Sequence, residues 1–140
     1  MRITGLSFGA LLFSMALLAA DETPFASIAN LATAFSENDP DGVMRYFDSQ
    51  MKDYGAIEAG VEALTAQTDV SCAIDVVMDD ESNGVHKLDL DWFMELKSQG
   101  DAPQLEQRRQ RVKIEMRQIK GIWKITAISP LSILDPIHIR

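Results

Sequence analysis

The chain has 140 residues, with 21 acidic side chains against 13 basic ones and a formal net charge of −8. This length suits one domain with one core and excludes two. The acidic balance gives nucleic acid or an anionic membrane no electrostatic basis for binding.

The N-terminus reads as a secretory signal peptide. A charged start is followed by an apolar run that ends in Ala19-Ala20, directly before Asp21. We therefore expect residues 1–20 to be removed and residues 21–140 to form one secreted or periplasmic domain, with no stable membrane insertion after cleavage. The apolar run is barely long enough to span a bilayer, which favours cleavage over anchoring. An uncleaved anchor is the alternative, because Leu18 at the third position before the cut is less typical than alanine.

Three helices are predicted in the first half of the domain. Thr23 can cap the first, with Pro24 in its first turn. Asp39-Pro40 ends this helix and starts a short second one, for which Asp39 is the cap. A third helix is expected over residues 56–67. The side chains at inward helical spacing are Phe25, Ile28, Leu31, Ala32 and Phe35, then Val43, Met44 and Phe47, then Ile57, Val61 and Leu64.

A long hairpin follows, and its side chains select its register. A three-residue loop ending at Gly84 pairs apolar residues only: Met78 with Leu88, Val76 with Leu90, Ile74 with Trp92 and Cys72 with Met94. A two-residue Asn83-Gly84 turn would instead set Met78 against Asp89. The hydrophobic match favours the longer loop, which also places Asp75 opposite Asp91 on the wet face.

Residues 111–128 form a second hairpin with one apolar face. A Lys120-Gly121 turn pairs Met116 with Ile125, Ile114 with Ala127 and Gln118 with Trp123. The opposite face is charged through Arg111, Lys113, Glu115, Arg117 and Lys124. The sheet is therefore wet on one side and covered by the helices on the other.

The order of elements resembles the NTF2-like (cystatin-like α+β) superfamily, and more narrowly its SnoaL-like members. The resembling residues are AFSENDPDGVMRYFDSQMKDYG, similar to the junction of the first two helices, and GIWKITAISPLSIL, similar to the closing strand. The resemblance implies an α+β cone in which about three N-terminal helices pack on a bent antiparallel sheet of four or more strands. Its members include isomerases, cyclases, dehydratases and binding modules, so fold alone does not select a function.

Catalytic members of this superfamily use a carboxylate inside the cone, together with acid donors that stabilise an enolate. We find no acid among the inward strand positions here, which favours a binding protein with an apolar cavity for a small hydrophobic ligand. The predicted pocket is Phe47, Ile74, Met78, Leu90, Trp92, Met94, Met116 and Trp123. Cys72 falls on the same face, where a buried inert thiol is favoured over a reactive one.

Few residues remain for acid–base chemistry. Tyr46, Asp48 and Tyr54 lie near the second helix and His86 at the end of the sheet. A small isomerase or dehydratase that uses them is the alternative function. His86 and His138 lie far apart in sequence and no metal or cofactor motif is present, so no cofactor is predicted.

The wet face of the sheet is the predicted interface of a homodimer, a form common in the resembled superfamily. Phe93 is a large aromatic among charged residues on this face, which include Asp91 and Arg117. The C-terminal tail LSILDPIHIR could cover Phe93 instead.

Overall fold

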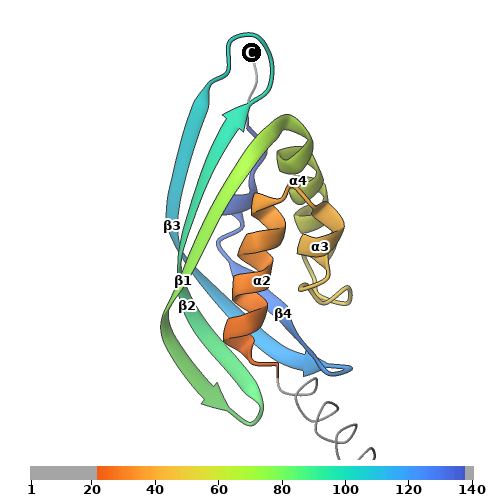
Figure 1. Cartoon of the computed structure of the whole chain (residues 1–140). Helices are drawn as coiled ribbons and strands as arrows, with labels where there is room; N and C mark the ends of the chain where they lie inside the picture. The colour runs from red at the N-terminus through yellow and green to blue at the C-terminus, as the bar shows by residue number, and fades with distance from the viewer. Residues whose placement is uncertain (1–21, 138–140) are drawn as a thin grey trace, which may run out of the picture.

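The computed structural model describes residues 22–137, and these form helices on one face of a curved, unclosed antiparallel sheet (Figure 1). The elements are α2 (Pro24–Ser36), α3 (Pro40–Met44), α4 (Tyr54–Gln67), β1 (Thr68–Ser82), β2 (Val85–Ser98), β3 (Leu105–Ile119), β4 (Ile122–Ser129) and the 3-10 turn η1 (Ser132–Leu134). The strand order is β1-β2-β3-β4. This confirms the predicted α+β cone, while the predicted signal peptide lies outside the described residues.

Helices α2 and α3 begin as their capping residues predict. The Thr23 hydroxyl accepts from the Ala26 amide at 3.1 Å, and the Asp39 carboxylate accepts from the Gly42 amide at 3.1 Å. The inward stripe of α2 is correct for Ile28, Leu31 and Phe35, whereas Phe25 is 49% exposed and Ala32 is only half-buried. Pro24 and Ser27 are buried instead. Pro24 lies one helical turn before Ile28, and Ser27 lies one turn before Leu31.

The β1-β2 hairpin differs from its prediction at the turn. Asn83 and Gly84 have φ of 54° and 79°, so they form a two-residue turn with both central residues left-handed, and Met78 lies opposite Asp89. A bulge at Val77 then restores the predicted pairs from Val76 downward. The predicted three-residue loop was wrong because one extra residue in the strand shifts the register by as much as one extra residue in the turn.

The β3-β4 hairpin has the predicted Lys120-Gly121 turn and the predicted Met116–Ile125 and Gln118–Trp123 pairs. A bulge at Thr126 then shifts the register, so Ile114 pairs with Ile128 rather than with Ala127. Ile128 is 7% exposed as a result, which places a larger apolar side chain in the core than the predicted alanine.

The C-terminal segment, residues 131–137, packs on the inner side of the sheet. Ile133 and Leu134 are buried, and Arg108 of β3 donates to the backbone oxygen of Ile133 at 3.1 Å. Phe93 points to the other face, so the described part of the tail does not cover it. No helix within residues 22–137 is long and apolar enough to cross a membrane.

Candidate functional site

The inner face of the cone is a packed core at the predicted ligand pocket. Trp92, Leu90, Met94 and Met116 are 0% exposed and Phe47 is 1% exposed. Phe35 of α2 closes on Trp92 in an edge-on contact with ring centroids 6.0 Å apart. Ile74 and Trp123 pack at the margin of this core, and Met78 is 60% exposed on the outer face because the Val77 bulge turns it away. The prediction that Met78 lines the pocket is therefore wrong. The predicted pocket residues that are buried pack against one another in the space that a ligand would need.

Two of the catalytic candidates have structural roles. Tyr46 is 8% exposed and its backbone oxygen accepts from the Ile125 amide at 2.7 Å. The Asp48 amide donates to the Ile125 oxygen at 2.9 Å, and its carboxylate accepts from the Gln50 amide at 3.1 Å. These residues fix the loop after α3 against the edge of β4. Tyr54 begins α4 at the border of the core.

His86 does have a carboxylate partner on the inner face, contrary to the prediction. The bulge at Val77 reverses the alternation of β1, so Asp79 and Glu81 pair with inward residues of β2. The Asp79 carboxylate lies 2.9 Å from His86 Nδ1, and the two side chains are 24% and 16% exposed. Sequence reasoning missed Asp79 because it continued the alternation through three consecutive apolar residues, Val76 to Met78. That run was itself a signal of the bulge.

Trp123 completes a small cluster with this pair at one end of the cone. Its ring meets that of His86 edge-on with centroids 4.9 Å apart. Its indole N–H donates to the backbone oxygen of Glu22 at 3.0 Å, just before α2. A carboxylate on Nδ1 holds a histidine in the tautomer whose Nε2 can accept a proton. Asp79, His86 and Trp123 therefore have the chemistry of a general base beside an apolar wall.

The single thiol has an unreactive environment. Burial raises the pKa of Cys72 to about 12, so the thiol stays protonated near neutral pH. Among residues 22–137, no group of three or more His, Cys, Asp or Glu side chains is arranged to hold a metal ion.

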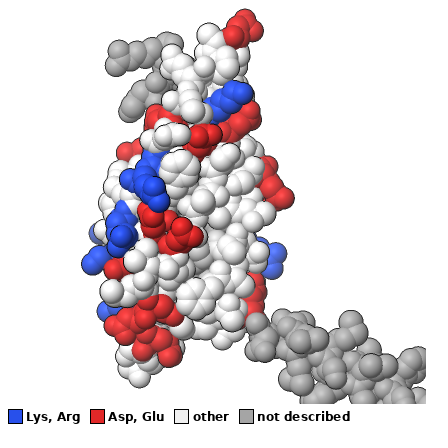
Figure 2. Space-filling model, turned by 60° about the vertical axis from the view of Figure 1, so that its left-hand side comes forward, with Lys and Arg blue, Asp and Glu red and all other residues white. Residues whose placement is uncertain are grey.

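The middle of the outer face of the sheet carries charges in two columns, and the pair beyond them, Lys87 and Glu115, has the reverse polarity. Asp75 of β1 faces Asp91 of β2, as predicted, and Asp89 and Asp91 face Lys113 and Arg111 of β3. Figure 2 views the molecule from this side and shows basic side chains gathered in a stripe, with acidic ones beside and below it. We call Asp75, Asp89, Asp91 and Glu95 the acidic column, and Arg109, Arg111, Lys113 and Arg117 the basic column.

The two columns already interact within one molecule. Arg109 donates to both carboxylate oxygens of Asp91, at 3.0 and 3.3 Å. This hydrogen bonding lowers the pKa of Asp91 and raises that of Arg109. Phe93 is half-buried between these charges, in the row between Ala73 and Arg109. The predicted interface residues Asp91, Phe93 and Arg117 thus share the outer face.

No protein-family model and no curated protein matches the chain. Several solved structures match it in fold. A putative scytalone dehydratase from Novosphingobium aromaticivorans has a TM-score of 0.64 and 10% identity over 91% of this chain and 85% of that one. A putative calcium/calmodulin-dependent protein kinase type II association domain from Thiobacillus denitrificans has a TM-score of 0.56 and 16% identity over 76% and 91%. An NTF2-like protein from Shewanella oneidensis has a TM-score of 0.54 and 12% identity over 76% and 97%.

These matches and the geometry define the class of the protein, an α+β cone of helices on a curved antiparallel sheet. More narrowly, the chain has the NTF2-like fold, which confirms the resemblance found in the sequence. At these identities the likeness shows the fold and leaves the activity to the residues.

Proposed function

We propose that this protein is a non-catalytic interaction module that associates with a second copy of itself through the outer face of its sheet. The non-catalytic role is supported by the filled interior, in which Trp92, Leu90, Met94 and Met116 are 0% exposed, and the self-association by the charge columns and half-buried Phe93 on the outer face. Side chains buried to this extent leave little room for a ligand at these four positions, where an enzyme or a ligand carrier of this fold would need a cavity. A matched neighbour bears the name of an association domain, which agrees with the same role.

The charge columns favour one arrangement of the two copies. A two-fold axis parallel to the strands, between β2 and β3, lays β2 of each copy over β3 of the other. Asp89 and Asp91 of one copy then face Lys113 and Arg111 of its partner. An axis across the strands would lay β2 over β2 and oppose acids to acids. Charge complementarity therefore selects the first arrangement.

The test uses two charge-reversed variants. Asp89→Lys with Asp91→Lys makes the central residues of the acidic column basic, and Arg111→Glu with Lys113→Glu makes the central residues of the basic column acidic. We expect each variant alone to be monomeric and an equimolar mixture to form a heterodimer, because residue 89 against 113 and residue 91 against 111 are then complementary in both directions. Sedimentation velocity measures both. Wild-type protein that stays monomeric at high micromolar concentration, or a mixture that does not associate, contradicts the proposal.

Phe93 gives a second test with a matched control. Phe93→Glu places a carboxylate in the centre of the face and should weaken self-association by about fivefold or more, since a buried aromatic contact contributes about 1–3 kcal/mol. Phe25→Glu changes an equally large aromatic that is 49% exposed on α2, away from the sheet face. Its dissociation constant should equal that of the wild type. Equal weakening by both variants would remove the sheet face from the interface.

We also propose that the protein is exported and that its mature form begins near Asp21. The support is the charged start, the apolar run and the terminal Ala19-Ala20 pair. Intact-mass measurement on material from its own host tests this. A product that retains Met1 contradicts cleavage, and one found with the membrane fraction supports the anchor.

A second candidate function is favoured by one observation, the Asp79–His86 pair at 2.9 Å. In this alternative, His86 Nε2 takes the proton on the α-carbon of an enolisable ketone and returns it to a neighbouring atom of the enolate, so that an isomerisation needs no redox partner. Asp79 holds Nδ1 protonated throughout. An isomerase rate lost in both His86→Gln and Asp79→Asn, with the circular dichroism of the wild type, would establish this enzyme. Absence of any rate across a ketone panel would exclude it for those substrates.

A further inference from the structure

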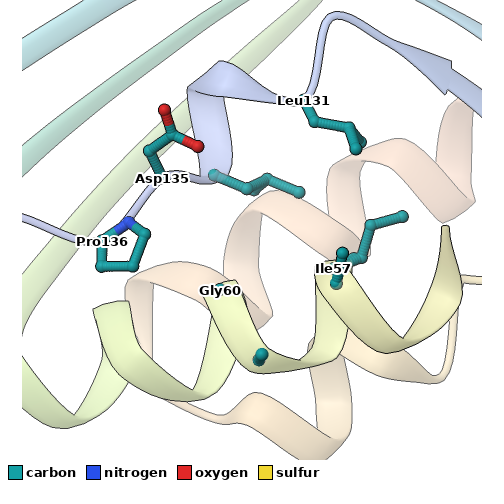
Figure 3. Close-up of a pocket in the computed structure, with 8 residues that line it drawn as sticks. Ile57, Gly60, Leu131, Asp135 and Pro136 are labelled. Atoms are coloured by element: carbon teal, nitrogen blue, oxygen red, sulfur yellow. The ribbon is translucent and has the colours of Figure 1, made fainter.

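A pocket of about 350 Å³ lies between α4 and the C-terminal segment, outside the cone interior and away from the outer face of the sheet (Figure 3). In Figure 3, Ile57 and Leu131 lie at one end of it and Asp135 and Pro136 at the other. The remaining lining residues are Ala56, Ala59, Gly60 and Leu134. The pocket is thus apolar along its length, with one carboxylate at its rim.

The pocket is open because three of the four α4 residues that line it, Ala56, Ala59 and Gly60, are small. Gly60 packs directly on the segment, and a Cβ built there would lie 2.6 Å from the Leu134 oxygen. The neighbouring Ala56 and Ala59 project only a methyl group and leave the volume open. The close approach at Gly60 sets the depth of the pocket, and the alanines keep it unfilled.

The opposite wall is held in place by hydrogen bonds. Arg108 donates to the backbone oxygens of Ile133 and Asp135. Gln110 and Ser132 exchange two hydrogen bonds, at 3.0 and 3.1 Å. Both β3 side chains come from the inner face of the sheet and reach the segment from behind. The wall is therefore formed before any ligand arrives, which lowers the ordering cost of binding.

The charge at the rim selects the ligand. Asp135 is exposed, and its backbone rather than its carboxylate engages Arg108. Arg108 is in turn paired with Glu106, so its charge is offset locally. The whole chain carries −8 in addition. An anionic ligand meets repulsion here, a neutral one gains only apolar contact, and a cationic one gains both contact and an ion pair.

We infer that this pocket binds a small apolar amine, with its hydrocarbon body against Ala56, Ala59 and Leu131 and its ammonium group at Asp135. The inference is independent of the proposed self-association, because no pocket residue lies on the outer face of the sheet.

The experiment compares three probes of one shape: benzylamine, benzyl alcohol and benzoate. Binding is followed by amide shifts of ¹⁵N-labelled protein at millimolar probe and low salt. Benzylamine should move the Ala59, Gly60 and Leu134 amides and bind about fivefold more tightly than benzyl alcohol, the ratio expected for an exposed ion pair. Benzoate should bind more weakly than either. Equal affinity for the three, or shifts confined to other residues, would overturn the inference.

Two variants and a control separate the pocket from the rest of the surface. Ala59→Leu fills the pocket and should abolish the shifts, and Asp135→Asn should reduce benzylamine to the affinity of benzyl alcohol. Ala66→Leu makes the same change at an exposed position of α4 that does not line the pocket, so it should bind as the wild type does. Unchanged binding by Ala59→Leu, with its fold verified by circular dichroism, would also overturn the inference.

Discussion

Gly60 is the residue at which the helix layer and the C-terminal segment come closest. An added Cβ would lie 2.6 Å from the Leu134 oxygen, a backbone atom that cannot yield cheaply. Gly60→Ala should therefore lower the free energy of unfolding by about 1–3 kcal/mol, despite the better helix propensity of alanine. Urea unfolding measures this.

Gly55 supplies the matched control in the same helix, since a Cβ there meets nothing within 4 Å. Gly55→Ala should be neutral or stabilising by up to about 1 kcal/mol, because only the propensity changes. If the two variants unfold at the same urea concentration, the close approach of α4 and the C-terminal segment is wrong.

Cys72 offers a second test at the scale of one residue. Its pKa of about 12 is raised by burial, so the reactive thiolate is scarce at pH 8 in the folded protein and increases as pH rises toward 12. An aromatic disulfide reagent should react slowly with native protein and rapidly in 6 M urea, as absorbance will report. Because Cys72 is the only cysteine of the chain, each molecule gives one signal. Fast native labelling at pH 8 would contradict the burial.

At the scale of elements, the C-terminal segment depends on one arginine. Arg108 donates to the Ile133 and Asp135 oxygens, so Arg108→Met should lower the free energy of unfolding by about 0.5–1.5 kcal/mol through the lost hydrogen bonds. The Leu134 amide donates to the Leu131 oxygen, and its hydrogen exchange should be faster in Arg108→Met than in the wild type. The control is Arg109→Met, since the Arg109 side chain is 69% exposed and points to the other face. Faster exchange in both variants would contradict a specific anchor.

Element by element, the apolar spacing predicted the helices and the faces of the strands, and capping predicted where α2 and α3 begin. The two bulges were not predicted, and they decide which residues reach the candidate site. Each adds one residue without breaking the apolar face, at Val77 and Thr126, so hydrophobic matching alone cannot distinguish it from a longer turn. Doubled apolar residues in an alternating strand were the available signal.

The role of Arg108 could not be predicted for a different reason. Residues 106–111 are polar on both faces of β3, so their alternation carries no inward or outward preference. Only the tertiary contact with the C-terminal segment shows that Arg108 points inward.

At the scale of the whole molecule, self-association through the charge columns should depend on salt. The Debye length falls from roughly 10 Å at 0.1 M to roughly 3 Å at 1 M, which screens the attraction between acidic and basic columns. The dissociation constant should therefore rise roughly tenfold over this range. Sedimentation equilibrium at several salt concentrations measures it. A dissociation constant that stays unchanged or falls as the salt concentration rises would indicate an interface stabilised by apolar contact instead.

Both outer edges of the sheet are covered in part by the chain's own residues. At β4, the Ile125 amide and oxygen are engaged by Tyr46 and Asp48. At β1, the Ser36 hydroxyl bonds both backbone groups of Cys72, and the Asn38 side chain accepts from the Val70 amide. Below these contacts the β1 edge is bulged and acidic, which discourages a further strand. These contacts disfavour extension of the sheet from one copy to the next, so the proposed assembly through the face should close at a finite size.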